Sequence, residues 1–181
     1  MSASYAPLLV MTIVSSIGAF DVLYYHVYRF RLYAQPSAQW ETATHLARGL
    51  LFAAGAYLMT RYEPRGAWFW VVTGVIALDF VNNVADVLLE PRARAPLGGL
   101  PPLEYLIHII GATASGLIGG LWFAFGLPLA DHPTELAPPG ELPGWLALNG
   151  YLLAAGGLAM AVFEAALLVR ARHRSPLPAA V

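Results

Sequence analysis

Histidines and carboxylates recur within apolar segments of this chain, and they are the residues whose types suit chemistry. His26, His45 and His108 lie in three separate hydrophobic segments. Imidazole nitrogens and carboxylate oxygens are donors that iron, manganese and zinc accept in proteins. An ionisable side chain in a bilayer-compatible segment is costly unless it meets a partner inside a bundle. These residues therefore indicate a metal site within a bundle of helices.

One segment, residues 67–90, carries a polar stripe among apolar residues. Its members fall at i, i+3, i+4, i+7 and i+11, which is one face of a helix: Asp79, Asn82, Asn83, Asp86 and Glu90. The two asparagines are more typical of helix-to-helix contacts than of metal ligands. If one member of the stripe binds a metal, we expect Asp86, with Asp79 tuning it from behind.

Two local pairs, Glu41 with His45 and Glu104 with His108, have i, i+4 spacing, so both side chains of each pair face one way. Carboxylate-bridged di-metal sites in helix bundles use a related i, i+3 spacing of Glu and His, from which this chain departs. The sequence contains no HExxH, GxSxG or P-loop motif. It also contains no cysteine, which excludes thiolate metal sites and disulfides.

The composition is that of an integral membrane protein. Hydrophobic residues make up 58% and charged residues 12% of the 181 residues, whereas soluble domains are about 25% charged. The net charge is −1 and no basic run is present, so a nucleic-acid partner is not expected. The expected partners are the lipid bilayer, a lipid-soluble substrate and other membrane proteins.

Five hydrophobic segments predict an all-α, single-domain bundle of about five transmembrane helices, at residues 7–28, 40–60, 67–90, 103–127 and 145–170. Each is close to the ~20 residues that a ~30 Å hydrocarbon core requires. The second segment is the weakest, because His45 and Arg48 lie in its first third. Alternatively, it begins at the interface and enters the membrane after Arg48.

The arginines predict the orientation. Eight of the ten lie on one side, in or beside the first and third connections and in the tail after the fifth segment, and only Arg61 and Arg65 lie on the other. By the positive-inside tendency, the N-terminus is outside and the C-terminus is cytoplasmic, as in a multi-pass protein of the cell membrane. The N-terminus lacks the positive region of a secretory signal, so we expect the first segment to be retained.

Depth, counted from the cytoplasmic helix ends at about 1.5 Å per residue, places one ionisable group of every segment in a common layer: His26, His45, Asp86, His108 and Glu164. A cytoplasmic rim is expected from Glu41, Glu90 and Glu104. Asp21 and Asp79 are expected to form a deeper pair with a catalytic role.

The leading hypothesis is a membrane metalloenzyme that acts on a lipid-soluble substrate near the cytoplasmic leaflet. Its predicted metal ligands are His26, His45, Asp86, Glu104, His108 and Glu164. Hydrolysis at a zinc site and oxidation at a di-iron site both fit these donors, and the surplus of carboxylates favours iron.

Other interpretations stay open at this level. The chain is alternatively a non-catalytic subunit of a larger membrane complex whose histidines ligate haem or a chlorophyll-type pigment. A third interpretation is a small proton or cation transporter with a relay of Asp21, Asp79 and Asp86. For single residues, His26 also fits an interfacial histidine, and Glu164 fits an ion pair with Arg48.

Overall fold

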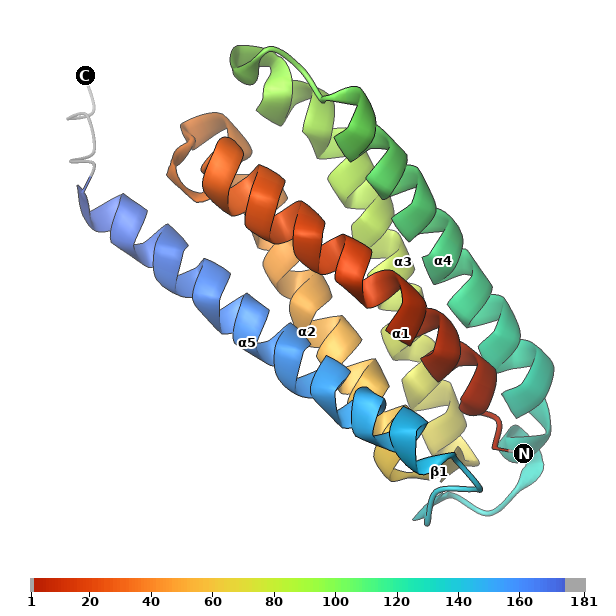
Figure 1. Ribbon diagram of the computed structural model, residues 1–181. Coiled ribbons are helices and arrows are strands. Elements are labelled where there is room, and N and C mark those ends of the chain that lie inside the picture. The colour runs from red at the N-terminus through yellow and green to blue at the C-terminus, as the bar shows by residue number, and fades with distance from the viewer. Residues whose placement is uncertain (1, 175–181) are drawn as a thin grey trace.

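The computed structural model describes residues 2–174 and is built from five long helices (Figure 1). Their bounds are α1 Tyr5–Phe20, continued by the π-helix η1 Asp21–Arg29; α2 Gln39–Arg61; α3 Ala67–Arg94; α4 Pro102–Gly126; and α5 Gly144–Arg174. The predicted all-α class is confirmed. The third helix is one turn longer than expected, because it continues through Pro91 to Arg94.

The helices form a closed ring in the order α1, α4, α3, α2, α5 and back to α1, since each packs mainly along those two neighbours. Figure 1 shows α1 between α5 and α4, with α2 and α3 behind it. Segments distant in the sequence, such as α1 and α4, therefore lie side by side.

Four helical stretches are long and apolar enough to cross a membrane: Tyr5–Arg29, Ala67–Leu97, Pro102–Asp131 and Gly144–His173. This indicates a membrane protein. The helix outside this set is α2, which the sequence already marked as the least apolar. Because α2 packs most extensively against α5 and α3, its polar side chains meet protein rather than lipid.

The interior of the ring has two different ends. At the end that holds the N-terminus, an apolar core surrounds Trp122, whose Nε1 donates to Thr73 Oγ1 at 3.0 Å and whose ring stacks on Phe69. The buried members of this core are Leu8, Met11, Ala56, Met59, Phe69, Val72, Trp122 and Leu146. The buried charged residues lie toward the other end.

Short elements close the two ends. At the N-terminal end, β1 Glu63–Arg65 pairs antiparallel with β2 Glu135–Ala137, after the 3-10 helix η5 Leu127–Asp131. The sequence predicted plain loops here, because strands of three residues are too short to show a periodicity. At the opposite end lie the 3-10 helices η2 Leu32–Ala34, η3 Pro36–Ala38 and η4 Ala95–Leu97.

Gly66 begins α3 in a conformation that requires glycine. Its φ is +57°, and a Cβ would lie 2.7 Å from both the His132 carbonyl oxygen and Thr134 Oγ1. We expect Gly66→Ala to destabilise the protein by more than about 1 kcal/mol, because both the backbone and the neighbouring loop resist a side chain. Thermal melting in detergent measures this loss. The control is Gly74→Ala within α3, where nothing lies within 4 Å, and equal melting temperatures for the two variants would contradict the prediction.

Candidate metal centre

A cluster of ionisable side chains fills the ring at the end opposite the N-terminus. It draws on η1, α2, α3, α4 and α5, and nearly all of its members are buried. The members are Asp21, His26, Glu41, His45, Asp86, Glu90, Arg94, Glu104, His108 and Glu164. All six residues predicted as metal ligands are therefore brought to one place.

A first group within the cluster could hold a cation. Asp21, His26, Glu104 and His108 each offer a ligand atom, and these atoms lie within 4.8 Å of one another. Asp21 Oδ2 lies 3.1 Å from His108 Nε2 and 3.5 Å from His26 Nε2. Glu104 Oε1 lies 3.4 Å from His26 Nε2. Two imidazoles and two carboxylates thus face a common point.

A second group adjoins the first and shares His26 with it. His26, His45 and Glu164 offer ligand atoms within 4.8 Å of one another, and the centroids of the two imidazole rings are 4.1 Å apart. Asp86 Oδ2 lies 3.2 Å from His45 Nε2. Asp86 also accepts a hydrogen bond from Thr44 Oγ1, which fixes its carboxylate beside this group.

The π-helix η1 explains why Asp21 belongs to the first group. Residues five apart on an α-helix point about 140° away from each other, since 3.6 residues make a turn. The wider π-helix bonds i to i+5, as in the 2.9 Å bond from Phe30 N to Tyr25 O, and brings residues at that spacing onto one face. Asp21 and His26 therefore act together, and the expected pair of Asp21 with Asp79 is not formed.

His108 is held between two carboxylates. Its Nδ1 donates to Glu90 Oε1 at 2.5 Å, while its Nε2 faces Asp21. In metal-bound histidines, a carboxylate on one imidazole nitrogen usually orients the ring while the other nitrogen binds the metal. Here that other nitrogen, Nε2, lies 3.1 Å from Asp21 Oδ2. Glu90, expected at the rim, is thus a partner of a candidate ligand.

Arg94 is a buried member of the cluster that the sequence did not single out. Its guanidinium forms ion pairs with Glu41 and Glu104, and its Nη2 lies 3.2 Å from His26 Nε2. A signal was present, because Arg94 follows Glu90 by four residues and so continues the polar stripe. Pro91 weakened that signal, because a proline within a helical pattern usually marks the end of the helix.

Several ligand atoms of the two groups lack partners within residues 2–174. Asp21 Oδ1, His26 Nδ1 and Glu104 Oε2 are buried and form no hydrogen bond, whereas His45 Nε2 has the Asp86 carboxylate 3.2 Å away. Most buried polar atoms in proteins are bonded. The cluster also holds six carboxylates, Asp21, Glu41, Asp86, Glu90, Glu104 and Glu164, against a single arginine. Bound cations would serve both the unpaired atoms and the excess of negative groups.

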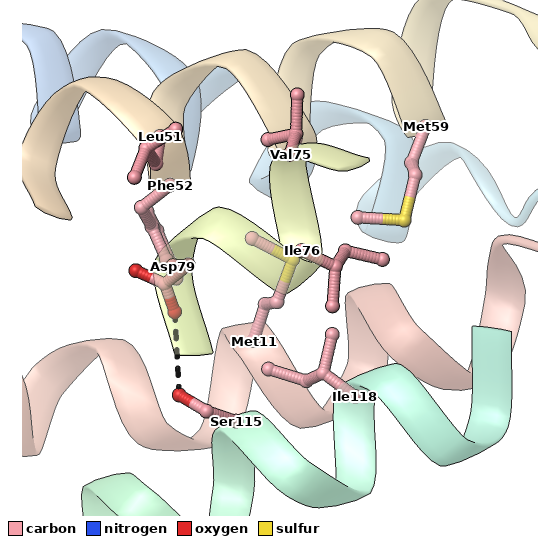
Figure 2. A pocket seen from close by; sticks show the side chains of 10 residues that line it. Met11, Leu51, Phe52, Met59, Val75, Ile76, Asp79, Ser115 and Ile118 are labelled. Carbon is pink, nitrogen blue, oxygen red and sulfur yellow. Dashed lines mark hydrogen bonds between the residues drawn. The ribbon is translucent and has the colours of Figure 1, made fainter. Parts of the chain in front are cut away.

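Asp79 lies outside both groups, about two helical turns from Asp86. Its Oδ2 accepts from Ser115 Oγ at 3.4 Å, as Figure 2 shows, and its Oδ1 lies 3.8 Å from Arg48 Nε. It borders an apolar cavity of about 30 Å³. Because Arg48 is engaged here, the alternative pair of Arg48 with Glu164 is not formed.

Other polar residues lie around or outside the cluster. Asn82 Nδ2 donates to the Thr44 carbonyl oxygen at 2.9 Å, so it joins α3 to α2 as expected for a helix-to-helix contact. The remaining histidines, His132 and His173, are exposed and lie outside the cluster.

Comparisons of the chain with known protein families, with curated proteins and with solved structures found no match. Function is therefore inferred from the chemistry of the two ligand groups.

Proposed function

We propose that this chain is an integral membrane metalloprotein with a histidine and carboxylate metal centre. All five helices cross the bilayer, with the N-terminus outside and the C-terminus in the cytoplasm, as the arginine distribution favours. The centre then lies near the cytoplasmic leaflet of a cell membrane. What supports the proposal most is the convergence of buried ligand atoms without hydrogen-bond partners, contributed by separate helices.

The ligands in this proposal are His26, His45, Asp86, Glu104, His108 and Glu164, joined by Asp21. Asp21 was expected to act from a deeper layer, but its 3.1 Å distance to His108 favours a role as a ligand. Asp79 is not a ligand in this proposal, since it is engaged by Arg48 and Ser115.

We propose that the centre oxidises a lipid-soluble substrate with iron. Three imidazoles surrounded by carboxylates match the mixed donors of di-iron proteins, in which several helices of a bundle contribute ligands. Zinc-dependent hydrolysis is the alternative reaction, because three histidines and a carboxylate also suit a zinc-bound water. A substrate from the bilayer fits a protein whose described residues form helices, connections and one small two-stranded sheet.

The packing of the histidines favours single ions over a haem or pigment. The rings of His26 and His45 are 4.1 Å apart at their centroids, which leaves no space between them for a macrocycle. A proton relay through Asp21, Asp79 and Asp86 gains less support, since Asp79 is engaged by Arg48 and Ser115.

Elemental analysis of the detergent-purified protein tests the proposal. We expect stoichiometric iron, manganese or zinc in the wild type and at most half of that content in His108→Ala, because the variant removes a ligand and its Glu90 support. His132→Ala, at an exposed histidine, is the matched control and retains the full content. Absence of stoichiometric metal from the wild type, or equal content in the two variants, would disprove a metal centre at this position.

A further inference from the structure

The two ligand groups have one residue in common. His26 belongs both to the group of Asp21, Glu104 and His108 and to the group of His45 and Glu164. A carboxylate serves two ions through its two oxygens, and an imidazole can do the same only through its two ring nitrogens. The position of each nitrogen of His26 therefore decides how the groups are related.

The Nε2 atom of His26 faces the first group, and its lone pair is engaged by Arg94. It lies 3.4 Å from Glu104 Oε1 and 3.5 Å from Asp21 Oδ2. It also lies 3.2 Å from Arg94 Nη2. A guanidinium only donates hydrogen bonds, so Nε2 accepts this one and its ring proton is on Nδ1. The lone pair on Nε2 is the one that a metal ion would use.

The Nδ1 atom of His26 forms no hydrogen bond within residues 2–174. Water cannot supply the missing partner easily, because the residue as a whole is only 3% exposed. His45 Nε2, in the second group, is also buried and has the Asp86 carboxylate 3.2 Å away. An unpaired N–H group in such a site is costly, so a partner for Nδ1 is to be expected.

We propose that His26 bridges two metal ions, which rests on the function proposed above. Nε2 binds the ion held by Asp21, Glu104 and His108. Nδ1 binds the ion held by His45 and Glu164, with Asp86 beside it.

The bridge has a definite proton balance. Nδ1 gives up its proton to solvent when the second ion binds, since metal ligands must be deprotonated, and His26 then carries one negative charge between two cations. Arg94 Nη2 leaves Nε2 when the first ion binds and keeps its ion pair with Glu41, which lies 2.8 Å away. No oxidation or reduction is involved.

Copper(II) provides the probe, because two copper ions joined by one imidazolate couple magnetically. The metal-free protein is loaded with Cu²⁺, and bound copper is compared with the electron paramagnetic resonance spectrum. We expect two ions per chain and a spin-coupled spectrum for the wild type. We expect one ion and an ordinary single-copper spectrum for Glu164→Gln, which keeps the size of the side chain while weakening the second group.

Further variants identify the bridge. Asp21→Asn, in the first group, is expected to retain one ion without coupling. His26→Gln is expected to lose the magnetic coupling, however much copper it still binds. Glutamine is chosen over alanine because it keeps a polar side chain at this buried position and so favours folding. His132→Ala is the control, with two coupled ions.

The outcomes separate this inference from the proposed function. Two ions without coupling in the wild type, or coupling that persists in His26→Gln, would refute the bridge while leaving a metal centre. One ion in the wild type would refute the second site and with it the bridge, while leaving a metal centre. No bound copper and no native metal would refute both proposals.

Discussion

Replacing Arg94 with methionine is expected to lower the melting temperature of the metal-free protein by on the order of 10 °C in detergent. Arg94 is 1% exposed and forms ion pairs with Glu41 and Glu104, which are both fully buried. Removing one partner of a buried ion pair costs about 3–5 kcal/mol, because the other charge stays buried and unpaired. For a chain of this size, each 1 kcal/mol shifts the melting temperature by about 2–4 °C.

Arg92→Met is the matched control, since Arg92 lies two residues earlier on α3 and is exposed. It is expected to change the melting temperature little. Adding a divalent cation should recover part of the stability that Arg94→Met loses, because the ion replaces positive charge beside Glu104. Equal melting temperatures for the two variants would show that Arg94 is not the counter-charge of the cluster.

Gly157→Leu is expected to destabilise the protein by about 1–3 kcal/mol and to lower metal binding by the second group. A Cβ at Gly157 would lie 3.0 Å from the Gly49 carbonyl oxygen and 3.3 Å from Ala53 Cβ, so α5 and α2 are in close contact there. A leucine must push the two helices apart. Glu164 lies two turns further along the same face of α5, and its distance from His45 on α2 would therefore grow.

Gly156→Leu is the control for this prediction, because nothing lies within 4 Å of a Cβ at Gly156. Melting temperature and metal content are measured on both variants. The role of the α2 and α5 contact in positioning the second group would be refuted if Gly157→Leu bound as much metal as Gly156→Leu.

The cluster could be predicted from the sequence because the arginines mark the helix ends. Once the ends are known, a fixed rise per residue gives each ionisable group its depth, and His45, Asp86 and Glu164 indeed meet at one level. Depth alone does not say which helices are neighbours. The approach of α1 to α4, which brings Asp21 to His108, follows from the ring order and has no local signal in the sequence.

The parts that were missed depend on departures from regular helices. Asp21 was assigned to a deeper layer because a straight α-helix was assumed, whereas η1 widens over residues 21–29. Arg94 lay beyond the expected segment 67–90, whereas α3 continues through Pro91 to Arg94. In both places the local pattern gives a weaker signal than the tertiary contacts that decide the structure.

The ring order also bears on biosynthesis. A chain made from its N-terminus inserts α1 to α4 before α5, so the ligands of the first group are all synthesised once His108 is complete. The second group is incomplete until Glu164 is made, because this residue lies on α5, the last helix. That helix closes the ring between α2 and α1. The order of the helices along the chain thus sets an order of assembly, in which the first ligand group can form early and the second only after α5 has joined the ring.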